Sequence, residues 1–582
     1  MQMYGRYYVS SEAENYSIEL EEKQLCDELE IVSVHMDFGE NVVPSRVSVM
    51  WEEEMAGVIF SGHPCCGRDF AIHQSWCASR SPSRFGFGAP VLYTVGENGI
   101  NCCTVAVNDA STPLSIKFWV DDFPQKYKVK YEVIFFDGNP EPISSYDADI
   151  LIDKRKIPYY EALASVYPWW KENGYSIPEI PAAAEDALYS TWYNFHQMPE
   201  SRALLEDLTV ASELGFKTVI IDDGWQFEGK PEGPFYSKCG DWEIAKDKFP
   251  DFKKFVNDVH SLGLKVVLWF AVPFIGPETK IYEKFRDKVL YYRADKTFVA
   301  DPRYPEIRRY IVDTYCRFIK DYDIDGFKLD FVDCIRAKEE SPAYNENMDY
   351  ITVDEAVKAL LTEIKTQTAE IKDDILFEYR QNYVGPAINM FGNMLRVGDC
   401  AYDSVINRIG LVSLRLLGYP VAVHSDMLYW SKNESITLCA FQLLNVMFSV
   451  PQISVILADS TDRQKELIKH FLSYWNENRD ILLHGKFIPL HPENNFSSVT
   501  AEDDEKQITV LYSELPFTYM NKNADVFHNG DINGIIFENP VNKPLQVEIF
   551  DCFGKMTEKV SVPEKTIMRL QVPVRGMFTV RE

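Results

Sequence analysis

Charged residues that could do chemistry recur at the ends of short apolar stretches in the middle of this sequence. In the stretch 325–331, DGFKLDF, Lys328 and Asp330 would lie on one face of a β-strand, with the phenylalanine and leucine side chains on the other. The neighbouring ammonium group of Lys328 favours the ionised form of Asp330. Such a carboxylate suits a nucleophile aimed at a substrate. A purely structural ion pair at a strand end is the alternative interpretation.

Other apolar stretches end in similar groups, and together these form a set rich in carboxylates, with fixed positive charges and indole rings. The set comprises Asp222, Asp223 and Trp225 after 217–221, Trp269 within 265–271, Lys328 and Asp330, Glu378 and Arg380 within 375–380, Arg396 and Asp399 around 394–397, and His424 and Asp426 after 421–423. If these stretches are the parallel strands of one barrel, their carboxyl ends meet at the face where such enzymes build active sites.

Three kinds of chemistry can be tested against this set. A metal hydrolase needs clustered histidines, and the sequence has neither HxH nor HExxH. A phosphosugar enzyme needs a glycine-rich loop after the seventh and eighth strands, where this chain has HSDM and VILADS. Glycoside hydrolysis needs two carboxyl groups beside the scissile bond, one ionised and one protonated. Asp330 suits the first role and Asp399 is the best candidate by position for the second, with Asp403 and Asp426 as rivals.

The elements that must position these groups follow a strand–helix rhythm, repeated eight times between 187 and about 476. The predicted strands are 187–195, 217–221, 265–271, 325–331, 375–380, 394–397, 421–423 and 452–457. This size and rhythm predict a (β/α)8 TIM barrel. An open doubly wound sheet is the alternative, but it would usually carry a glycine-rich turn after its first strand, where this chain has WYN.

Short alternating runs separated by turn residues flank the barrel on both sides. We predict an N-terminal β-sandwich over 1–165, a linker over 166–186, the catalytic barrel over 187–484 and a small C-terminal β-domain over 485–582. The predicted fold class is therefore α/β, with a central barrel between two β-domains.

The composition of the sequence limits the classes of binding partner that can be expected. The formal net charge of -29 argues against nucleic acid and anionic membranes, and agrees with a small neutral oligosaccharide or glycoside. No run of 18 apolar residues predicts a membrane helix, and the N-terminus lacks the pattern of a secretory signal. The 12 cysteines show no zinc-site spacing and are expected to be reduced thiols in a cytoplasmic protein. No metal or cofactor is implied.

Three motifs, in order and at the right strands, resemble one family. DDGW at 222–225, KLD at 328–330 and Arg-x-x-Asp at 396–399 are similar to the motifs of the retaining α-galactosidases of glycoside hydrolase family 36, in the clan shared with family 27. The resemblance extends to the domain order, so it covers essentially the whole chain. It implies hydrolysis of terminal α-galactosides, and assembly into homo-oligomers, as relatives often do.

The resemblance also implies roles for most residues of the set. Asp330 would form a covalent glycosyl-enzyme and Asp399 would act as acid and then base. Asp222 and Asp223 would bind the O4 and O6 hydroxyls, Lys328 and Arg396 would bind ring hydroxyls or orient the carboxylates, Trp225 and Trp269 would form apolar walls, and Arg380 would match an arginine after the strand-five motif. His424 and Asp426 are candidates for substrate contact from their position at a strand end alone, and a solvated polar strand end is the alternative interpretation.

Two departures from the family pattern leave open which sugar the protein recognises. Many members carry WFEPE in the third strand, where this chain has WFAVP at 269–273, and their Cys- and Gly-rich strand-five motif is replaced by EYRQNY at 378–383. Specificity for α-N-acetylgalactosaminides or α-glucosides, or transglycosylation as in the raffinose synthases, therefore stays open beside α-galactosidase activity. A non-catalytic sugar-binding protein is the alternative from another class.

Overall fold

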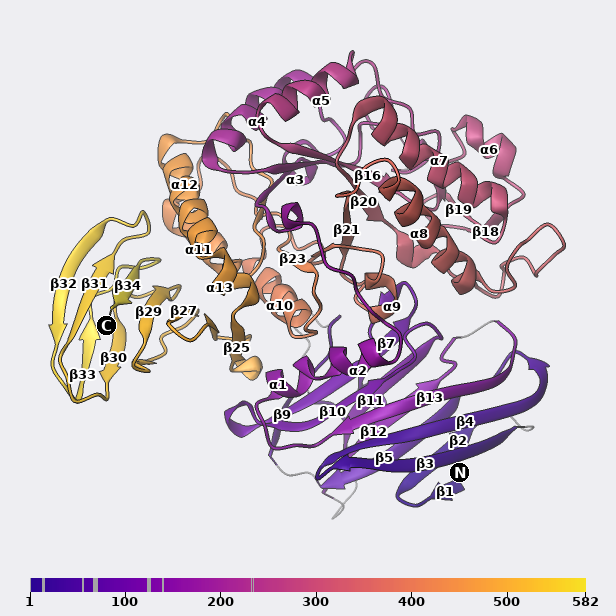
Figure 1. Ribbon diagram of the computed structural model, residues 1–582, viewed down its shortest axis with the longest axis horizontal. Helices are drawn as coiled ribbons and strands as arrows, with labels where there is room; N and C mark the ends of the chain where they lie inside the picture. Colours follow the sequence, from indigo (N-terminus) through magenta and orange to yellow (C-terminus); the bar gives the residue numbers. More distant parts are fainter. Residues whose placement is uncertain are drawn as a thin grey trace.

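The chain folds as a central α/β barrel between two β-rich parts, as the computed structural model shows (Figure 1). The structure describes residues 2–12, 16–54, 57–65, 72–122, 127–138, 141–231, 233 and 235–581. The N-terminal sheets and the C-terminal sheets lie at two separate places against the barrel (Figure 1). The domain boundaries predicted at 165, 186 and 484 remain predictions, although the type of element changes near each of them.

Eight parallel strands form the central barrel. In spatial order they are β23 (Ala422–His424), β22 (Met394–Arg396), β21 (Leu376–Arg380), β20 (Gly326–Asp330), β16 (Lys265–Ala271), β15 (Thr218–Ile221), β14 (Leu188–Ser190) and β24 (Gln452–Ile453). A parallel bridge between His424 and Val450 joins β23 to the segment that leads into β24, and so closes the ring. This arrangement confirms the predicted fold class and excludes the open sheet.

Helices follow the strands, as the predicted strand–helix rhythm requires. They are α4 (Ser201–Leu214), α5 (Phe252–Ser261), α7 (Pro305–Tyr322), α8 (Val353–Ala369), α9 (Pro386–Asn389), α10 (Ser404–Arg415), α11 (Ile436–Asn445) and α12 (Asp462–Glu477). Their start points follow from local chemistry, because Thr352 and Thr461 each form a capping box with the residue three positions later. Apolar side chains of these helices then cover the outside of the barrel.

The first strand is shorter than predicted. The prediction ran from 187 to 195, but β14 ends at Ser190 and a short helix, α3 (Trp192–Phe195), follows. The chain turns there because the Thr191 hydroxyl accepts a hydrogen bond from the backbone N–H of Asp222 at 2.9 Å, and the Ser454 hydroxyl accepts one from the N–H of Tyr193 at 2.9 Å. This turn brings Trp192 to the mouth of the barrel.

A long excursion after β16 covers one side of the mouth. It contains β17 (Phe274–Ile275), α6 (Lys280–Phe285), β18 (Val289–Tyr292) and β19 (Phe298–Ala300), and the three strands form a small sheet. The ring of Phe274 stacks on that of Phe331 with centroids 4.5 Å apart. The excursion therefore supports the segment that directly follows β20.

The N-terminal part is a sandwich of two antiparallel sheets. One sheet holds, in order, β1 (Gln2–Tyr4), β2 (Tyr7–Ser11), β5 (Val47–Glu54), β12 (Lys128–Phe135), β11 (Leu114–Asp121), β7 (Ser79–Arg84) and β8 (Phe87–Gly88); the other holds β3 (Ser17–Cys26), β4 (Leu29–Val42), β13 (Ile143–Asp153), β10 (Asn101–Val107), β9 (Val91–Gly96) and β6 (Val58–Gly62). Alternating buried residues from both sheets form the core, in which Trp51 stacks on Tyr131. The stretch predicted as a linker from 166 includes the packed helix α2 (Val166–Glu172), which follows α1 (Tyr159–Ala164).

The sandwich contacts the barrel mouth directly. The Gln381 side-chain amide, just after β21, donates a hydrogen bond to the Pro64 carbonyl at 2.5 Å, and the backbone N–H of Gly88 donates one to the Asn382 carbonyl at 2.8 Å. These bonds fix the segment after β6 over the carboxyl ends of the barrel strands.

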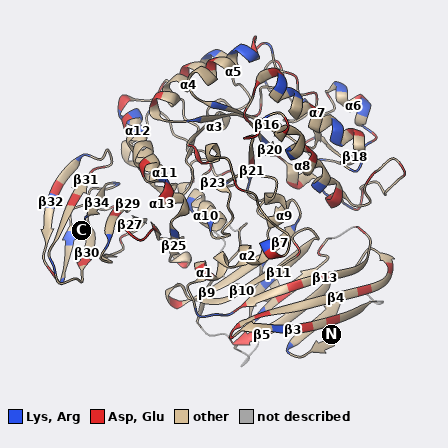
Figure 2. Cartoon of the chain, in the orientation of Figure 1, with Lys and Arg blue, Asp and Glu red and all other residues tan. Residues whose placement is uncertain are grey.

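The C-terminal part consists of two further sheets beyond α13 (Arg479–His484). The larger holds β25 (Lys486–Leu490), β26 (Ser498–Glu502), β27 (Lys506–Leu511), β29 (Asn523–His528), β34 (Met577–Val580), β31 (Leu545–Phe550) and β32 (Met556–Val562); the smaller holds β28 (Phe517–Thr518), β30 (Ile535–Asn539) and β33 (Thr566–Leu570). They enclose a core of their own. Acidic residues are spread over all three parts of the chain rather than gathered in one (Figure 2). None of the helices in the described ranges has the length and apolar character that crossing a membrane requires.

Candidate active site

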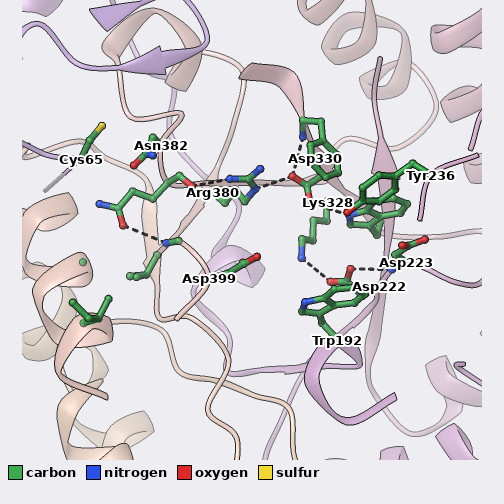
Figure 3. Close-up of a pocket in the computed structure, with 17 residues that line it drawn as sticks. Cys65, Trp192, Asp222, Asp223, Tyr236, Lys328, Asp330, Arg380, Asn382 and Asp399 are labelled. Carbon is green, nitrogen blue, oxygen red and sulfur yellow. Dashed lines mark hydrogen bonds and ion pairs between the residues drawn. The ribbon is translucent and has the colours of Figure 1, made fainter. Parts of the chain in front are cut away.

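A cavity of about 440 Å³ opens at the carboxyl ends of the barrel strands. Figure 3 shows that its labelled side chains converge from several strand ends. Seven of the predicted residues line it: Asp222, Asp223, Trp269, Lys328, Asp330, Arg380 and Asp399. The position agrees with the general rule that parallel barrels build their sites at this face.

Asp330, the last residue of β20, is held by four hydrogen-bond donors. Its Oδ1 accepts from Arg380 Nε at 2.7 Å, from the backbone N–H of Phe331 at 2.8 Å and from the hydroxyl of Tyr383 at 3.1 Å. Its Oδ2 accepts from Trp269 Nε1 at 3.1 Å. Burial alone would raise the pKa of this carboxyl group, but the positive charges of Arg380 and Lys328 hold it well below its usual range. Asp330 is therefore a fixed, ionised carboxylate.

The backbone directly after Asp330 adopts an unusual conformation. Phe331 has a φ of 62°, in the left-handed region that non-glycine residues seldom occupy. Such conformations persist only where the surroundings impose them, and they concentrate at functional sites. Here the ring of Phe331 packs against Phe274 and Tyr236, while its N–H contacts Asp330 and Tyr383. The turn ends the strand so that the Asp330 side chain faces the cavity.

Asp222 and Lys328 form a buried ion pair beside the nucleophile candidate. Lys328 Nζ lies 2.6 Å from Asp222 Oδ2, and both side chains are almost fully buried. Asp222 Oδ1 also accepts a hydrogen bond from the backbone N–H of Asp223 at 2.8 Å. Because an unpaired charge buried here would be costly, the pairing holds both side chains in place.

Asp223 lies deeper and has a different character. Amide groups of Gln226, at 2.6 Å, and Gln197 donate hydrogen bonds to its two oxygens. Burial raises the pKa of Asp223 to about 7, although these amides favour its ionised form. Near neutral pH the carboxyl group therefore exists in both protonation states, so it can accept a hydrogen bond from a sugar hydroxyl or donate one to it.

Asp399, after β22, faces the same cavity and is its most exposed carboxylate. Its side chain is 60% exposed and its Oδ1 lies 2.9 Å from Arg396 Nη2. Partial burial would raise the pKa of Asp399, but Arg396, and beyond it Lys328, hold the pKa below its usual value, while the negative charge of Asp330 opposes them. In the ligand-free site Asp399 is thus ionised.

Arg396 lies beneath the cavity and connects three carboxylates. Besides Asp399, it contacts Asp426 Oδ1 at 2.5 Å and Glu378 Oε1 at 3.3 Å, and its side chain is 1% exposed. Asp426 in turn accepts hydrogen bonds from the Tyr193 hydroxyl at 2.8 Å and the Cys400 N–H at 2.7 Å. These contacts fix the position of Arg396, and Arg396 in turn orients Asp399.

Four predicted site residues do not line the cavity. Arg396 and Asp426 lie in the network just described. Trp225 is fully buried among Phe270, Phe318 and Trp242, and its indole N–H donates to the Trp269 carbonyl at 2.9 Å, so it supports the strand that carries Trp269. His424 lies inside the barrel against the Ala184 carbonyl at 2.7 Å, and burial lowers its pKa to about 4.

The cavity also contains residues outside the predicted set of site residues, among them Cys65, Trp192, Tyr236, Gln381 and Asn382. Trp192 belongs to the turn after β14, and Tyr236 to the long loop after β15. Cys65 comes from the N-terminal sandwich, and no local pattern marks it. The aromatic residues beside predicted strand ends were the available signal for Trp192.

Among the residues that the structure describes, no group of three or more His, Cys, Asp or Glu side chains is arranged to hold a metal ion. The chemistry of the cavity is that of carboxylates, fixed cations and aromatic rings, which suits a polyhydroxylated ligand.

Comparison with known proteins agrees with this geometry. The family model Melibiase matches residues 186–485, which is more than half of the chain and corresponds to the barrel. The α-galactosidase Mel36A of Lactobacillus acidophilus is 29% identical over 127 residues, which are 21% of this chain and 17% of that protein. The probable α-galactosidase C of Aspergillus flavus is 29% identical over 155 residues, 24% of this chain and 20% of its own. The aligned parts thus span a fifth or less of these curated relatives.

Solved structures share the fold over nearly the whole chain. A variant of the family 36 α-galactosidase AgaA of Geobacillus stearothermophilus, in complex with raffinose, superposes with a TM-score of 0.63 at 13% identity and covers 97% of this chain and 81% of that one. The α-galactosidase of Thermus thermophilus gives a TM-score of 0.51 at 16% identity, with 78% and 94% covered. These structures show a shared fold, and the match to the Melibiase family model confirms the family expected from the sequence motifs.

Proposed function

This chain belongs to the Melibiase family, and from that premise we propose that it is a retaining, exo-acting α-galactosidase that hydrolyses terminal α-galactosides of oligosaccharides. The observation that carries the proposal is the pairing of Asp330 and Asp399 in one cavity, the first ionised and fixed by four donors, the second open to solvent. Two carboxyl groups beside the scissile bond are the requirement of glycoside hydrolysis.

In the first step, Asp330 attacks the anomeric carbon and the bond to the leaving oxygen breaks. The donors around Asp330 hold the attacking carboxylate in one orientation, which reduces the ordering that the transition state requires. Asp399 gives a proton to the leaving oxygen. A bound sugar would cover Asp399 and strengthen the effect of burial on its pKa, and the negative charge of Asp330 acts in the same direction.

In the second step, Asp399 accepts a proton from water, which attacks the glycosyl-enzyme. The ester at Asp330 no longer carries a negative charge, so its raising effect on the pKa of Asp399 is lost and Arg396 favours the ionised, basic form. The same residue can thus serve as acid and then base, as retention requires.

The rest of the cavity would select the sugar. Asp222 and Asp223 offer carboxyl oxygens at one end, next to the aromatic rings of Trp192 and Tyr236 (Figure 3). A polar edge beside aromatic faces is the usual environment for a pyranose ring with its hydroxyl groups. The departures at 269–273 and 378–383 surround this region, so the choice among related α-glycosides rests on measurement.

The test is a panel of aryl α-glycosides: galactoside, N-acetylgalactosaminide, glucoside and xyloside. We expect the highest kcat/KM on the α-galactoside, and proton NMR is expected to detect α-galactose as the first product. Fastest turnover of another α-glycoside would reassign the sugar and keep the mechanism. A β-configured first product, or activity on β-glycosides alone, would contradict the proposed reaction.

A further inference from the structure

The geometry around β20 and β21 points to Tyr383 as a positioning residue that holds Oδ1 of Asp330 and leaves Oδ2 to attack the anomeric carbon; we propose this role for it. The inference rests on the proposed function, since it assigns the attacking oxygen of the same reaction. Tyr383 is the last residue of the segment 378–383 that departs from the family pattern, and the resemblance assigns it no role; it lies beyond the end of β21 and does not line the cavity.

Tyr383 connects three parts of the nucleophile's surroundings. Its hydroxyl donates to Asp330 Oδ1 at 3.1 Å and accepts from the backbone N–H of Phe331 at 2.7 Å. Its ring is fully buried, and the guanidinium carbon of Arg380 lies 5.1 Å from the ring centroid. The phenol therefore supports the carboxylate, the left-handed turn after it and the arginine that neutralises it.

The two oxygens of Asp330 are unequally satisfied. Oδ1 receives three hydrogen bonds, from Arg380, Phe331 and Tyr383, whereas Oδ2 receives one, from Trp269. A carboxylate oxygen with three donors has little remaining capacity to share electrons with carbon, while the other keeps a free lone pair. Oδ2 would form the bond to the anomeric carbon as the bond to the leaving oxygen breaks and Asp399 supplies its proton.

Removing the Tyr383 hydroxyl should change the titration of Asp330 in a known direction. A donor to an ionised carboxylate lowers its pKa, so its loss raises the pKa and moves the acidic limb of the kcat/KM profile to higher pH. Other groups that act electrostatically on Asp330 come from several elements: Arg380 on β21, Lys328 on β20, Asp223 and Tyr236 after β15, Asp333 and Cys334 in the turn after β20, and Asp399 after β22. Of these groups, Asp333 also receives a hydrogen bond from the Tyr383 hydroxyl, which Tyr383→Phe removes as well, whereas the others keep their own contacts.

The experiment compares Tyr383→Phe with Tyr379→Phe. Tyr379 is a matched control because it is also fully buried, packs edge-on against Tyr383 with ring centroids 5.9 Å apart, and its hydroxyl has no hydrogen-bond partner among the described residues. For Tyr383→Phe we expect kcat/KM on a disaccharide substrate to fall about tenfold and the acidic limb to rise by about one pH unit, from loss of one hydrogen bond to a charged group. Tyr379→Phe should match the wild type in both.

The possible outcomes of this experiment distinguish the positioning role of Tyr383 from the proposed function. An unchanged acidic limb in Tyr383→Phe, with the wild type active, overturns the positioning role alone. Equal shifts in both variants would mean that loss of either tyrosine hydroxyl loosens the core, and this result would overturn the positioning role as well. A wild type without activity on any α-glycoside overturns the proposed function and this inference together. Equal melting temperatures of the two variants show that the kinetic difference is not a folding defect.

Discussion

Asp330→Ala is expected to lower kcat on an aryl α-galactoside by at least about 10³-fold, because the variant lacks the atom that bonds to the anomeric carbon. The remaining cavity still holds Asp222, Lys328 and Arg380, so the sugar should bind with a similar KM. Added azide should fill the vacated space and restore part of the rate, and the product should be β-galactosyl azide, since a single displacement inverts the anomeric carbon. Rate assays and NMR of the azide product provide the measurement.

A substitution at the opposite end of the same strand serves as a control that separates an effect on catalysis from an effect on stability. Asp325 lies just before β20 and pairs with Lys372 Nζ at 2.8 Å and with His260 Nε2 at 2.8 Å, far from the cavity lining. Burial would raise its pKa, but these partners and the backbone N–H of Val266 lower it to about 2. We expect Asp325→Asn to keep kcat while losing about 2 kcal/mol of unfolding free energy at pH 7.

The pH dependence of that loss has a defined sign. Because the folded-state pKa of Asp325 is lowered, its stabilisation is complete above the unfolded value near 4 and disappears as the pH falls toward about 2. The difference in urea midpoint between Asp325→Asn and wild type should therefore shrink below pH 4. Equal loss of kcat in Asp325→Asn and Asp330→Ala would contradict a specific chemical role for Asp330.

Asp399→Ala is expected to show an effect that depends on the leaving group. A disaccharide needs a proton on its leaving oxygen, so its kcat/KM should fall by about 10²- to 10⁴-fold. A dinitrophenyl α-galactoside leaves without a proton, so its kcat/KM should change little, although hydrolysis of the glycosyl-enzyme becomes slow without a base. Azide needs no base, and it should restore turnover and give α-galactosyl azide.

Asp403 provides the matched control for Asp399. It lies four residues later, caps α10 by accepting from the Ile406 N–H at 3.0 Å, and is absent from the cavity lining. Asparagine caps helices about as well as aspartate, so Asp403→Asn should keep both stability and activity. A disaccharide rate that falls in Asp403→Asn and not in Asp399→Ala would transfer the acid role to Asp403.

The sequence was sufficient for the barrel and for the charged residues at its strand ends. Local periodicity defines strands such as β16 and β20, and parallel strands must bring their carboxyl ends to one face. That rule is enough to bring Asp222 beside Lys328 and Asp330, although Asp222 lies over a hundred residues before them in the chain. The strand–helix rhythm likewise predicted that helices cover the outside of the barrel.

The positions of the rings and of the distant segments could not be predicted in this way. Strand alternation ends with β15, so it does not reveal that Trp225 turns into the core, whereas Trp192 lines the cavity after an unpredicted turn. Cys65 reaches the mouth only through contacts between the sandwich and residues 381–382. The burial of Arg396 and Asp426 likewise depends on their mutual pairing, which a strand-end pattern does not encode.

Trapping of the glycosyl-enzyme tests the central claim most directly. A fluorinated α-galactosyl fluoride should inactivate the wild type with time, because the ring fluorine slows both steps while the good leaving group keeps formation of the glycosyl-enzyme faster than its hydrolysis. Digestion and mass spectrometry should then place one fluorogalactosyl group on the Asp330 carboxyl. A label on another residue, or rapid fluoride release from an enzyme that never carries a covalent sugar, would contradict Asp330 as the nucleophile.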